Sequence, residues 1–287
     1  MVDTQVVKLP DGRDLAWIEL GDAGGPVVFG FHGTPGSCRQ MAVDEKPIVA
    51  AGVRFVCPDR PGYGLSSFHP RRTLAGWADD ISFLADHLAV DRFAVVGVSG
   101  GGPHAAACAC LLPELVVAAG LISGVGPLAE PGAEEGMLAL NRFMTRVARH
   151  APSLARPVFG LSTAVGRRWP ERAMSAFRRQ LPAPDAEVLA RPEVLAAFVE
   201  DLRDASRTAA RAAVQDFALF ARDWGFRLED IAVPVHVWQG DVDRNVPPAH
   251  AKLQARRIPG AVLHECPGEG HMLVIDHMEE ILRAVTA

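Results

Sequence analysis

The sequence predicts an α/β protein: a doubly wound, mostly parallel sheet with a helical cap inserted between two of its strands. Short apolar runs alternate with helical or loop stretches in the first part of the chain, which is the pattern of a parallel sheet. A long helical stretch punctuated by prolines then interrupts this pattern, and strand-like runs return near the C-terminus. We therefore expect a core domain in two parts, residues 1–126 and 212–287, with the cap at residues 127–211.

The expected strands are short apolar runs bounded by turn residues. In chain order they are Gln5–Leu9, Asp14–Leu20, Pro26–Phe31, Val53–Cys57, a run that begins at Phe93, Val116–Ile122, Val233–Trp238 and Ala261–Glu265. Pro10-Asp11-Gly12 predicts a hairpin between the first two strands. Apolar side chains at helical spacing predict a helix over Leu74–Leu88, and an alanine-rich stretch predicts another over Ala105–Leu112. In such a sheet, ligands bind at the carboxyl ends of the strands.

Composition and charge exclude several classes of function. The chain has 287 residues, of which 49% are hydrophobic, and its net charge of −5 offers no basic surface for nucleic acid. No apolar run is long enough to span a bilayer, and the first residues lack the features of a secretory signal. The five cysteines are scattered and form no C-x-x-C pair, which is typical of free thiols in a reducing compartment. We expect a cytoplasmic protein with no nucleic-acid or membrane partner.

The most informative motif is Gly97-Val98-Ser99-Gly100-Gly101, where a buried strand meets a helix. A serine at a sharp strand-to-helix turn has a strained backbone, and its neighbours must lack side chains for the chain to close there. The strain exposes the Ser99 hydroxyl, and Pro103 fits the first helical turn, where no N–H is needed. Ser99 is therefore the candidate nucleophile.

A nucleophilic serine needs a base, and the base needs an orienting carboxylate. His271 is the candidate base because it lies in a glycine-rich turn after the last expected strand, at the same sheet edge as Ser99. Two aspartates, Asp241 and Asp243, follow the Val233 strand. We expect Asp243 to be the orienting carboxylate because it lies further into the loop, and Asp241 is the alternative. Aspartates at such positions also cap turns and helices.

The oxyanion of an acyl-transfer reaction needs two N–H donors. Gly100 can supply one of them from the start of the helix. The loop His32–Gly36 follows another strand at the same sheet edge and can supply the second from Thr34. We also expect His32 to shape this loop by hydrogen bonding.

Over nearly its whole length the chain resembles the α/β-hydrolases. The motifs that carry the resemblance are HGTPG (32–36), DRPGYGLS (59–66), GVSGG (97–101), GDVDRNVP (240–247) and GEGH (268–271). Their order of serine, aspartate and histidine is the one this fold uses. The resemblance implies that Asp243 completes a triad with Ser99 and His271. It also implies that Asp59–Ser66 shapes the pocket wall and the core without a chemical role.

Within this family, a serine at the nucleophile position excludes the branches that use an aspartate there, such as epoxide hydrolases. Tyr63, the only tyrosine, lies outside the expected cap and so cannot serve as a cap tyrosine for an epoxide. We expect a serine esterase for small or medium acyl substrates, with a small-molecule substrate and with neither a cofactor nor a metal. The oligomeric state stays open.

Four alternatives remain. The HGTPG loop resembles that of proline iminopeptidases, but between residues 142 and 211 there are 13 arginines and 7 acidic residues, a balance that disfavours an ammonium substrate. A lactonase would use the same triad. A cofactor-free peroxidase and a non-catalytic ligand receptor also occur on this fold, although the complete motif set disfavours the receptor. Apolar cap residues that could line an acyl pocket are Phe143, Met144, Val147, Phe159, Trp169, Met174, Phe177 and Phe198.

Overall fold

The computed structural model describes residues 3–150, 152–205 and 209–287. In this part of the chain, the strands form one eight-stranded sheet in the order β1-β2-β4-β3-β5-β6-β7-β8. The strands are β1 (Gln5–Lys8), β2 (Asp14–Gly21), β3 (Val27–Phe31), β4 (Arg54–Pro58), β5 (Phe93–Val98), β6 (Val116–Ile122), β7 (Val235–Gly240) and β8 (Val262–Cys266). The pairs β1–β2 and β2–β4 are antiparallel, and all later pairs are parallel. The mostly parallel sheet predicted from the sequence is confirmed.

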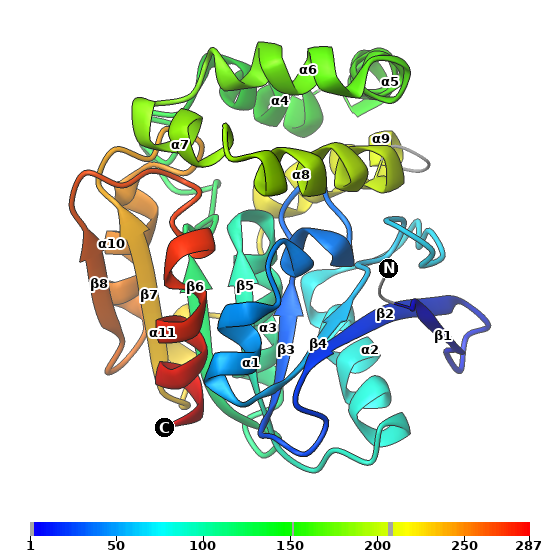
Figure 1. Cartoon of the computed structure of the whole chain (residues 1–287), viewed down its shortest axis with the longest axis vertical. Coiled ribbons are helices and arrows are strands. Elements are labelled where there is room, and N and C mark those ends of the chain that lie inside the picture. Colours follow the sequence, from blue (N-terminus) through cyan, green and yellow to red (C-terminus); the bar gives the residue numbers. More distant parts are fainter. Residues whose placement is uncertain (1–2, 151, 206–208) are drawn as a thin grey trace.

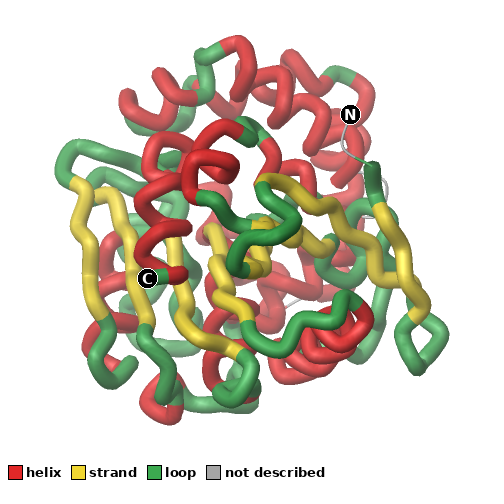
Figure 2. Tube along the Cα trace, turned by 60° about the horizontal axis from the view of Figure 1, so that its bottom comes forward, coloured by secondary structure: helices red, strands yellow, loops and turns green. Residues whose placement is uncertain are grey.

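Helices cover both faces of this sheet (Figures 1 and 2). One face carries α1 (Lys46–Ala51) and α11 (Val274–Thr286), and the other carries α2 (Leu74–His87), α3 (Gly102–Leu111) and α10 (Pro248–Arg257). Each face has its own apolar core, which explains why β5, at the centre of the sheet, is buried along its whole length. Short 3₁₀ helices lie at Cys38–Ala42, Ser99–Gly101 and Leu228–Asp230.

The ends of several helices follow from local sequence. The Thr73 hydroxyl accepts a hydrogen bond from the Gly76 N–H (2.9 Å) and so caps α2 one residue before Leu74, where the sequence placed its start. The final helix, α11, begins at Val274.

A second group of helices lies between β6 and β7 and sits over the carboxyl ends of the strands (Figure 1). We call this group the cap. Its helices are α4 (Ala139–His150), α5 (Pro152–Arg168), α6 (Pro170–Arg178), α7 (Ala183–Val188), α8 (Pro192–Ala205) and α9 (Ala209–Phe220). The predicted boundary after Arg211 falls inside α9, and the division into core and cap domains remains a proposal.

Among the described residues, no helix combines the length and the apolar character needed to cross a bilayer.

Candidate active site

Ser99 follows β5 directly and has the strained backbone that its motif predicts. Its φ is +56°, in the left-handed region that non-glycine residues rarely adopt. The neighbouring glycines explain how the chain closes around it. A Cβ at Gly97 would collide with the Gly101 carbonyl oxygen, and a Cβ at Gly101 would collide with the Phe31 carbonyl oxygen. Only glycine therefore fits at these two positions.

His271 and Asp243 meet across two loops at the same edge of the sheet. Asp243 lies in the loop after β7 and His271 in the turn after β8, and His271 Nδ1 is 2.8 Å from Asp243 Oδ2. Because a carboxylate only accepts, Nδ1 carries the proton, and Nε2 is left as the basic nitrogen. Asp241 is exposed and instead accepts a hydrogen bond from the Gly268 N–H (2.7 Å). Of the two candidate acids, Asp243 is the one that contacts His271.

The Asp243 carboxylate is fixed by its own loop as well as by the imidazole. Its Oδ1 accepts hydrogen bonds from the N–H groups of Asn245 (2.8 Å) and Val246 (3.0 Å). Its Oδ2 accepts a further bond from Gln239 Nε2 (3.2 Å), and the side chain is fully buried. These contacts hold the carboxylate in one orientation toward His271.

The surroundings of His271 raise its pKa above the ordinary value for histidine. Burial acts in the opposite direction and would lower this pKa. The charge of Asp243 and its hydrogen bond outweigh the burial, and the charge of Asp185 adds to them. His271 is therefore a stronger base than a free imidazole.

Asp185 is a residue that sequence reasoning missed. It lies on α7 in the cap and is 1% exposed, and its Oδ1 accepts a hydrogen bond from the Met272 N–H (2.8 Å). Its Oδ2 has no hydrogen-bond partner among the described residues and packs against Gly270, where a Cβ would collide with the carboxylate. Asp185 thus contacts both chain neighbours of His271, Gly270 and Met272, and so holds the turn that carries this histidine. In the sequence it reads only as an acidic residue at the start of a helix.

Ser99 and His271 line the same cavity. The described residues include no hydrogen bond between the Ser99 hydroxyl and the imidazole. Catalytic hydrogen bonds are often long without substrate and tighten when it binds. The assignment of Ser99, Asp243 and His271 as a catalytic triad remains a proposal.

The expected oxyanion donors lie next to each other. A Cβ at Gly33 would be 3.4 Å from Ser99 Cβ, and a Cβ at Gly100 would be 3.2 Å from Thr34 N. The Gly33 N–H donates a hydrogen bond to Gln40 Oε1 (2.5 Å). In the described part of the chain, the N–H groups of Thr34 and Gly100 donate to no protein acceptor. These two N–H groups are therefore free to bind an oxyanion beside Ser99.

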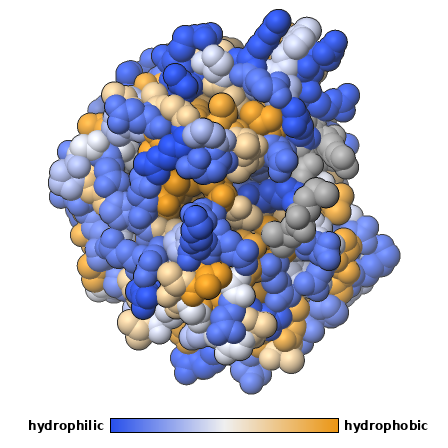
Figure 3. Space-filling model, viewed as in Figure 1, coloured by the Kyte–Doolittle hydropathy of each residue, from blue (hydrophilic) through white to orange (hydrophobic). Residues whose placement is uncertain are grey.

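The cavity in front of Ser99 has a volume of about 410 Å³ and lies between cap and core. Apolar side chains gather between the cap helices at the top of the view and the core beneath them (Figure 3). Of the eight cap residues proposed for an acyl pocket, Met174, Phe177 and Phe198 line the cavity. Phe143 and Trp169 are exposed instead, and Met144 and Phe159 pack in a cluster within the cap, which Val147 contacts. No lysine or arginine is among the described lining residues.

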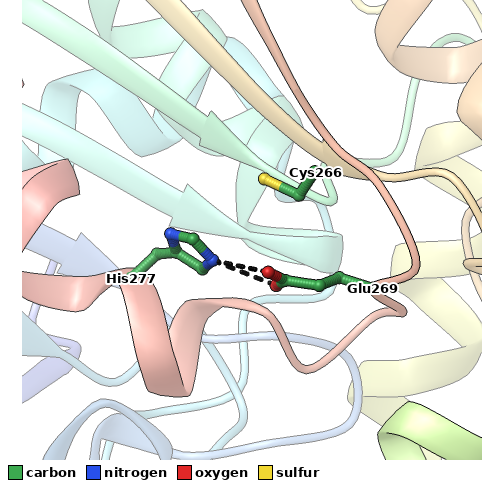
Figure 4. Close-up of side chains that lie close together, drawn as sticks. All are labelled: Cys266, Glu269 and His277. Atoms are coloured by element: carbon green, nitrogen blue, oxygen red, sulfur yellow. Dashed lines mark hydrogen bonds and ion pairs between the residues drawn. The ribbon is translucent and has the colours of Figure 1, made fainter.

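Cys266, Glu269 and His277 form a cluster of metal-binding residue types outside this cavity (Figure 4). His277 Nε2 is within 3.0 Å of both Glu269 oxygens, and its Nδ1 is 3.1 Å from Glu280 Oε2. Burial, and then the charges of Glu269 and Glu280, raise the pKa of Cys266 to about 11, so that the thiol is protonated at neutral pH. His277 lies on α11 and Glu269 lies in the turn before His271, so we interpret the cluster as a hydrogen-bonded link between that turn and α11.

The chain is similar to known proteins over most of its length. A family model described as Alpha/beta hydrolase family matches residues 27–284. A bifunctional esterase/perhydrolase from Acinetobacter calcoaceticus is 27% identical over 98% of each chain. A 2-hydroxy-6-oxononadienedioate/2-hydroxy-6-oxononatrienedioate hydrolase from Cupriavidus pinatubonensis is 28% identical over 98% of this chain and 93% of the relative. A hydrolase structure from Pseudomonas aeruginosa superimposes with a TM-score of 0.74 over 99% of this chain and 98% of that one, at 20% identity, which is a likeness of fold.

Proposed function

The chain belongs to the alpha/beta hydrolase family, and from this premise we propose that it is a serine hydrolase that cleaves carboxylic esters through an acyl-enzyme on Ser99. The observation that carries the proposal is the His271–Asp243 hydrogen bond of 2.8 Å at the cavity that Ser99 also lines. A strained serine, a histidine with a raised pKa and two unused N–H groups around one cavity are the parts that acyl transfer requires.

In the proposed mechanism, the Ser99 hydroxyl attacks the ester carbonyl while His271 Nε2 takes its proton. The N–H groups of Thr34 and Gly100 bind the oxyanion, and Asp243 stabilises the imidazolium. When the tetrahedral intermediate collapses, the alcohol leaves with the proton from His271. Water then attacks the acyl-enzyme while His271 takes its proton. When the second tetrahedral intermediate collapses, His271 gives this proton to Ser99 Oγ and the carboxylic acid is released.

The cavity favours an uncharged, apolar acyl group. Aromatic and aliphatic side chains dominate its described lining, and the charged groups there are acids such as Asp44 and Asp201. A buried carboxylate on the substrate would find no cation to compensate the loss of its hydration. The relative from Cupriavidus pinatubonensis is named for a dioate, a substrate with two carboxylates, and such a substrate fits this lining poorly. The arginines of the cap do not reach the cavity in its described part.

Perhydrolysis is a second candidate because one relative is named an esterase/perhydrolase. In that reaction hydrogen peroxide, in place of water, attacks the acyl-enzyme and releases a peracid. Bromination of monochlorodimedone in the presence of hydrogen peroxide, acetate and bromide measures it, because the peracid oxidises bromide to the brominating species. Aminopeptidase and lactonase activities would use the same residues.

We also propose a cytoplasmic location, which the five free cysteines favour.

The test is a comparison of two esters that differ in charge, 4-nitrophenyl hexanoate and 4-nitrophenyl hydrogen glutarate. We expect hexanoate to react with a kcat/KM at least about tenfold higher, and Ser99→Ala to react with neither. A lactone and a prolyl 4-nitroanilide in the same assay measure the alternative activities. Preference for the anionic ester would contradict the substrate class, and full activity of Ser99→Ala would contradict the mechanism.

A further inference from the structure

A buried cluster of charges lies beneath the loop that carries Thr34. Asp216, on α9 in the cap, is fully buried, and its Oδ2 accepts hydrogen bonds from Arg60 Nη1 (2.7 Å), Thr34 Oγ1 (2.7 Å) and the Tyr63 hydroxyl (2.8 Å). Its Oδ1 accepts a bond from Arg72 Nη2 (2.5 Å). The proposed acyl transfer uses none of these charged side chains directly.

This cluster has a high desolvation cost, so its presence calls for an explanation. Burial would raise the pKa of Asp216, but the charges of Arg60 and Arg72 outweigh it and hold that pKa below the ordinary value. The carboxylate is therefore ionised. Apolar side chains of similar volume often stabilise a protein as well as a buried ion pair does. Stability alone therefore does not explain why these charged residues are buried, whereas their contacts with the neighbouring loop give them a second role.

Arg60 holds the carbonyl of Gly33. Arg60 Nη2 donates to the Gly33 oxygen (2.8 Å) and also to Thr34 Oγ1 (2.8 Å). A second donor, His32 Nδ1, lies 2.9 Å from the same carbonyl oxygen. The Arg60 N–H donates to His32 Nε2 (3.0 Å), which leaves the proton on Nδ1, and burial followed by the charge of Arg60 keeps the pKa of His32 well below its ordinary value. The Gly33 carbonyl is therefore fixed by two donors.

Fixing this carbonyl also fixes the Thr34 N–H, because the two groups belong to one peptide unit. The Gly33–Thr34 peptide is trans and planar, so its N–H points away from its carbonyl oxygen. The carbonyl faces Arg60 and His32, so the N–H points to the opposite side of the peptide. Gly100 lies close to Thr34, since a Cβ at Gly100 would be 2.3 Å from Thr34 Oγ1 and 3.2 Å from Thr34 N.

We propose that Arg60, held by Asp216 of the cap, is a positioning residue that aims the Thr34 N–H at the oxyanion formed on Ser99. The proposal rests on the proposed serine-hydrolase function. It connects the cap to the chemistry of the core, since a carboxylate from α9 determines the orientation of a peptide in the loop after β3.

Arg72 offers a matched control. It binds the same carboxylate and is similarly buried, but its other hydrogen bonds go to the carbonyl oxygens of Pro61 and Ala212 and not to Gly33. The experiment compares Arg60→Lys with Arg72→Lys, because a lysine cannot supply the two directed donors of a guanidinium. Thermal unfolding of both variants measures the structural cost of each change.

For Arg60→Lys we expect kcat on 4-nitrophenyl hexanoate to fall about 10- to 100-fold, with KM nearly unchanged. One oxyanion donor contributes a factor of about 10²–10³ to kcat, and a donor that points in the wrong direction loses part of that factor. For Arg72→Lys we expect a loss of thermal stability comparable to that of Arg60→Lys, but a kcat within about threefold of wild type. A trifluoromethyl ketone, which forms a hemiketal oxyanion on Ser99, should bind Arg60→Lys more weakly by the same factor as kcat/KM. The affinity for hexanoate, the product acid, should not change.

Equal losses of kcat in the two lysine variants, or a normal kcat in Arg60→Lys, would overturn the proposal. If Arg60→Lys does not fold, Asp216→Asn serves instead, because the amide keeps the shape of the side chain and removes the negative charge that holds Arg60 and Arg72. The affinity of Asp216→Asn for the trifluoromethyl ketone should then fall, while its affinity for hexanoate should stay the same. An unchanged affinity for the trifluoromethyl ketone would contradict the proposal. The proposed function itself fails separately, if wild-type protein hydrolyses no ester and a fluorophosphonate does not label Ser99.

Discussion

The core and the cap contribute to the site in different ways. The core supplies the groups proposed to react, and Ser99, Asp243 and His271 each follow the end of a strand. The cap supplies carboxylates that bind core loops. Three of them, Asp185, Asp201 and Asp216, are at most 4% exposed.

These cap aspartates bind the loops that follow β3 and β8. Asp185 binds the Met272 N–H beside His271, and Asp216 binds Thr34 and Arg60. Asp201 accepts bonds from the N–H (2.7 Å) and the hydroxyl (2.8 Å) of Ser37, in the loop after β3. Changes in the core should therefore abolish the chemistry, whereas changes in the cap should alter, by degrees, the alignment of the reacting groups and the pKa of His271.

The largest effect is expected from the proposed nucleophile and base. Ser99→Ala should lower kcat for ester hydrolysis about 10⁴- to 10⁶-fold, and the double variant with His271→Ala should lose little more, because triad members act as a unit. Steady-state kinetics of the two single variants and the double variant measure this. Multiplicative losses in the double variant would mean that the two residues act independently.

The next largest effect separates the two candidate acids. Asp243→Asn should lower kcat about 10³- to 10⁴-fold, because the amide favours the wrong imidazole tautomer. Asp241→Asn changes an exposed side chain in the same loop and should stay within about threefold of wild type. Measured kcat values for the two variants decide between them, and a reversed order would move the acid to Asp241.

A smaller effect should come from the cap. Since His271 must be neutral to act as a base, activity should rise with pH through its raised pKa and reach a plateau above it. Asp185→Asn removes one of the negative charges that raise this pKa. The acid limb of the kcat/KM profile should therefore move to lower pH, with plateau activity within about threefold of wild type. Glu187→Gln, an exposed change on the same helix, is the control, and an equal shift in both variants would argue against a specific role for Asp185.

The smallest effect is expected at the surface of the cap. The Arg191–Asp276 pair joins cap to core at 2.5 Å, but its side chains are 41% and 46% exposed. Arg191→Ala should therefore cost less than about 1 kcal/mol of unfolding free energy and leave kcat unchanged. Denaturant unfolding and ester hydrolysis measure the two quantities. A loss of activity here would show that the surface of the cap, and not only its buried aspartates, supports the site.

The core could be predicted from the sequence because its signals are local. The run Val116–Ile122 is strand β6 without any change of bounds, and the glycines beside Ser99 indicated the strained turn that is present. The order of the strands was not predicted, since pairing is decided by packing between distant segments. Asp243 could be preferred to Asp241 only from its place in the loop and from the family resemblance.

The contribution of the cap could not be predicted, because its partners lie far away in the sequence. Asp216 binds a residue 182 positions away, and Asp201 binds one 164 positions away. In the sequence, such aspartates look like ordinary polar positions of amphipathic helices. Only the folded arrangement places them against the loops that follow β3 and β8.

An activated serine at position 99 is tested most directly by labelling the pure protein with a fluorophosphonate and measuring its intact mass. We expect a single rapid addition to wild type, none to Ser99→Ala, and slowed labelling of His271→Ala. Wild type that stays unlabelled while folded, or Ser99→Ala that is labelled as fast as wild type, would contradict an activated serine at position 99.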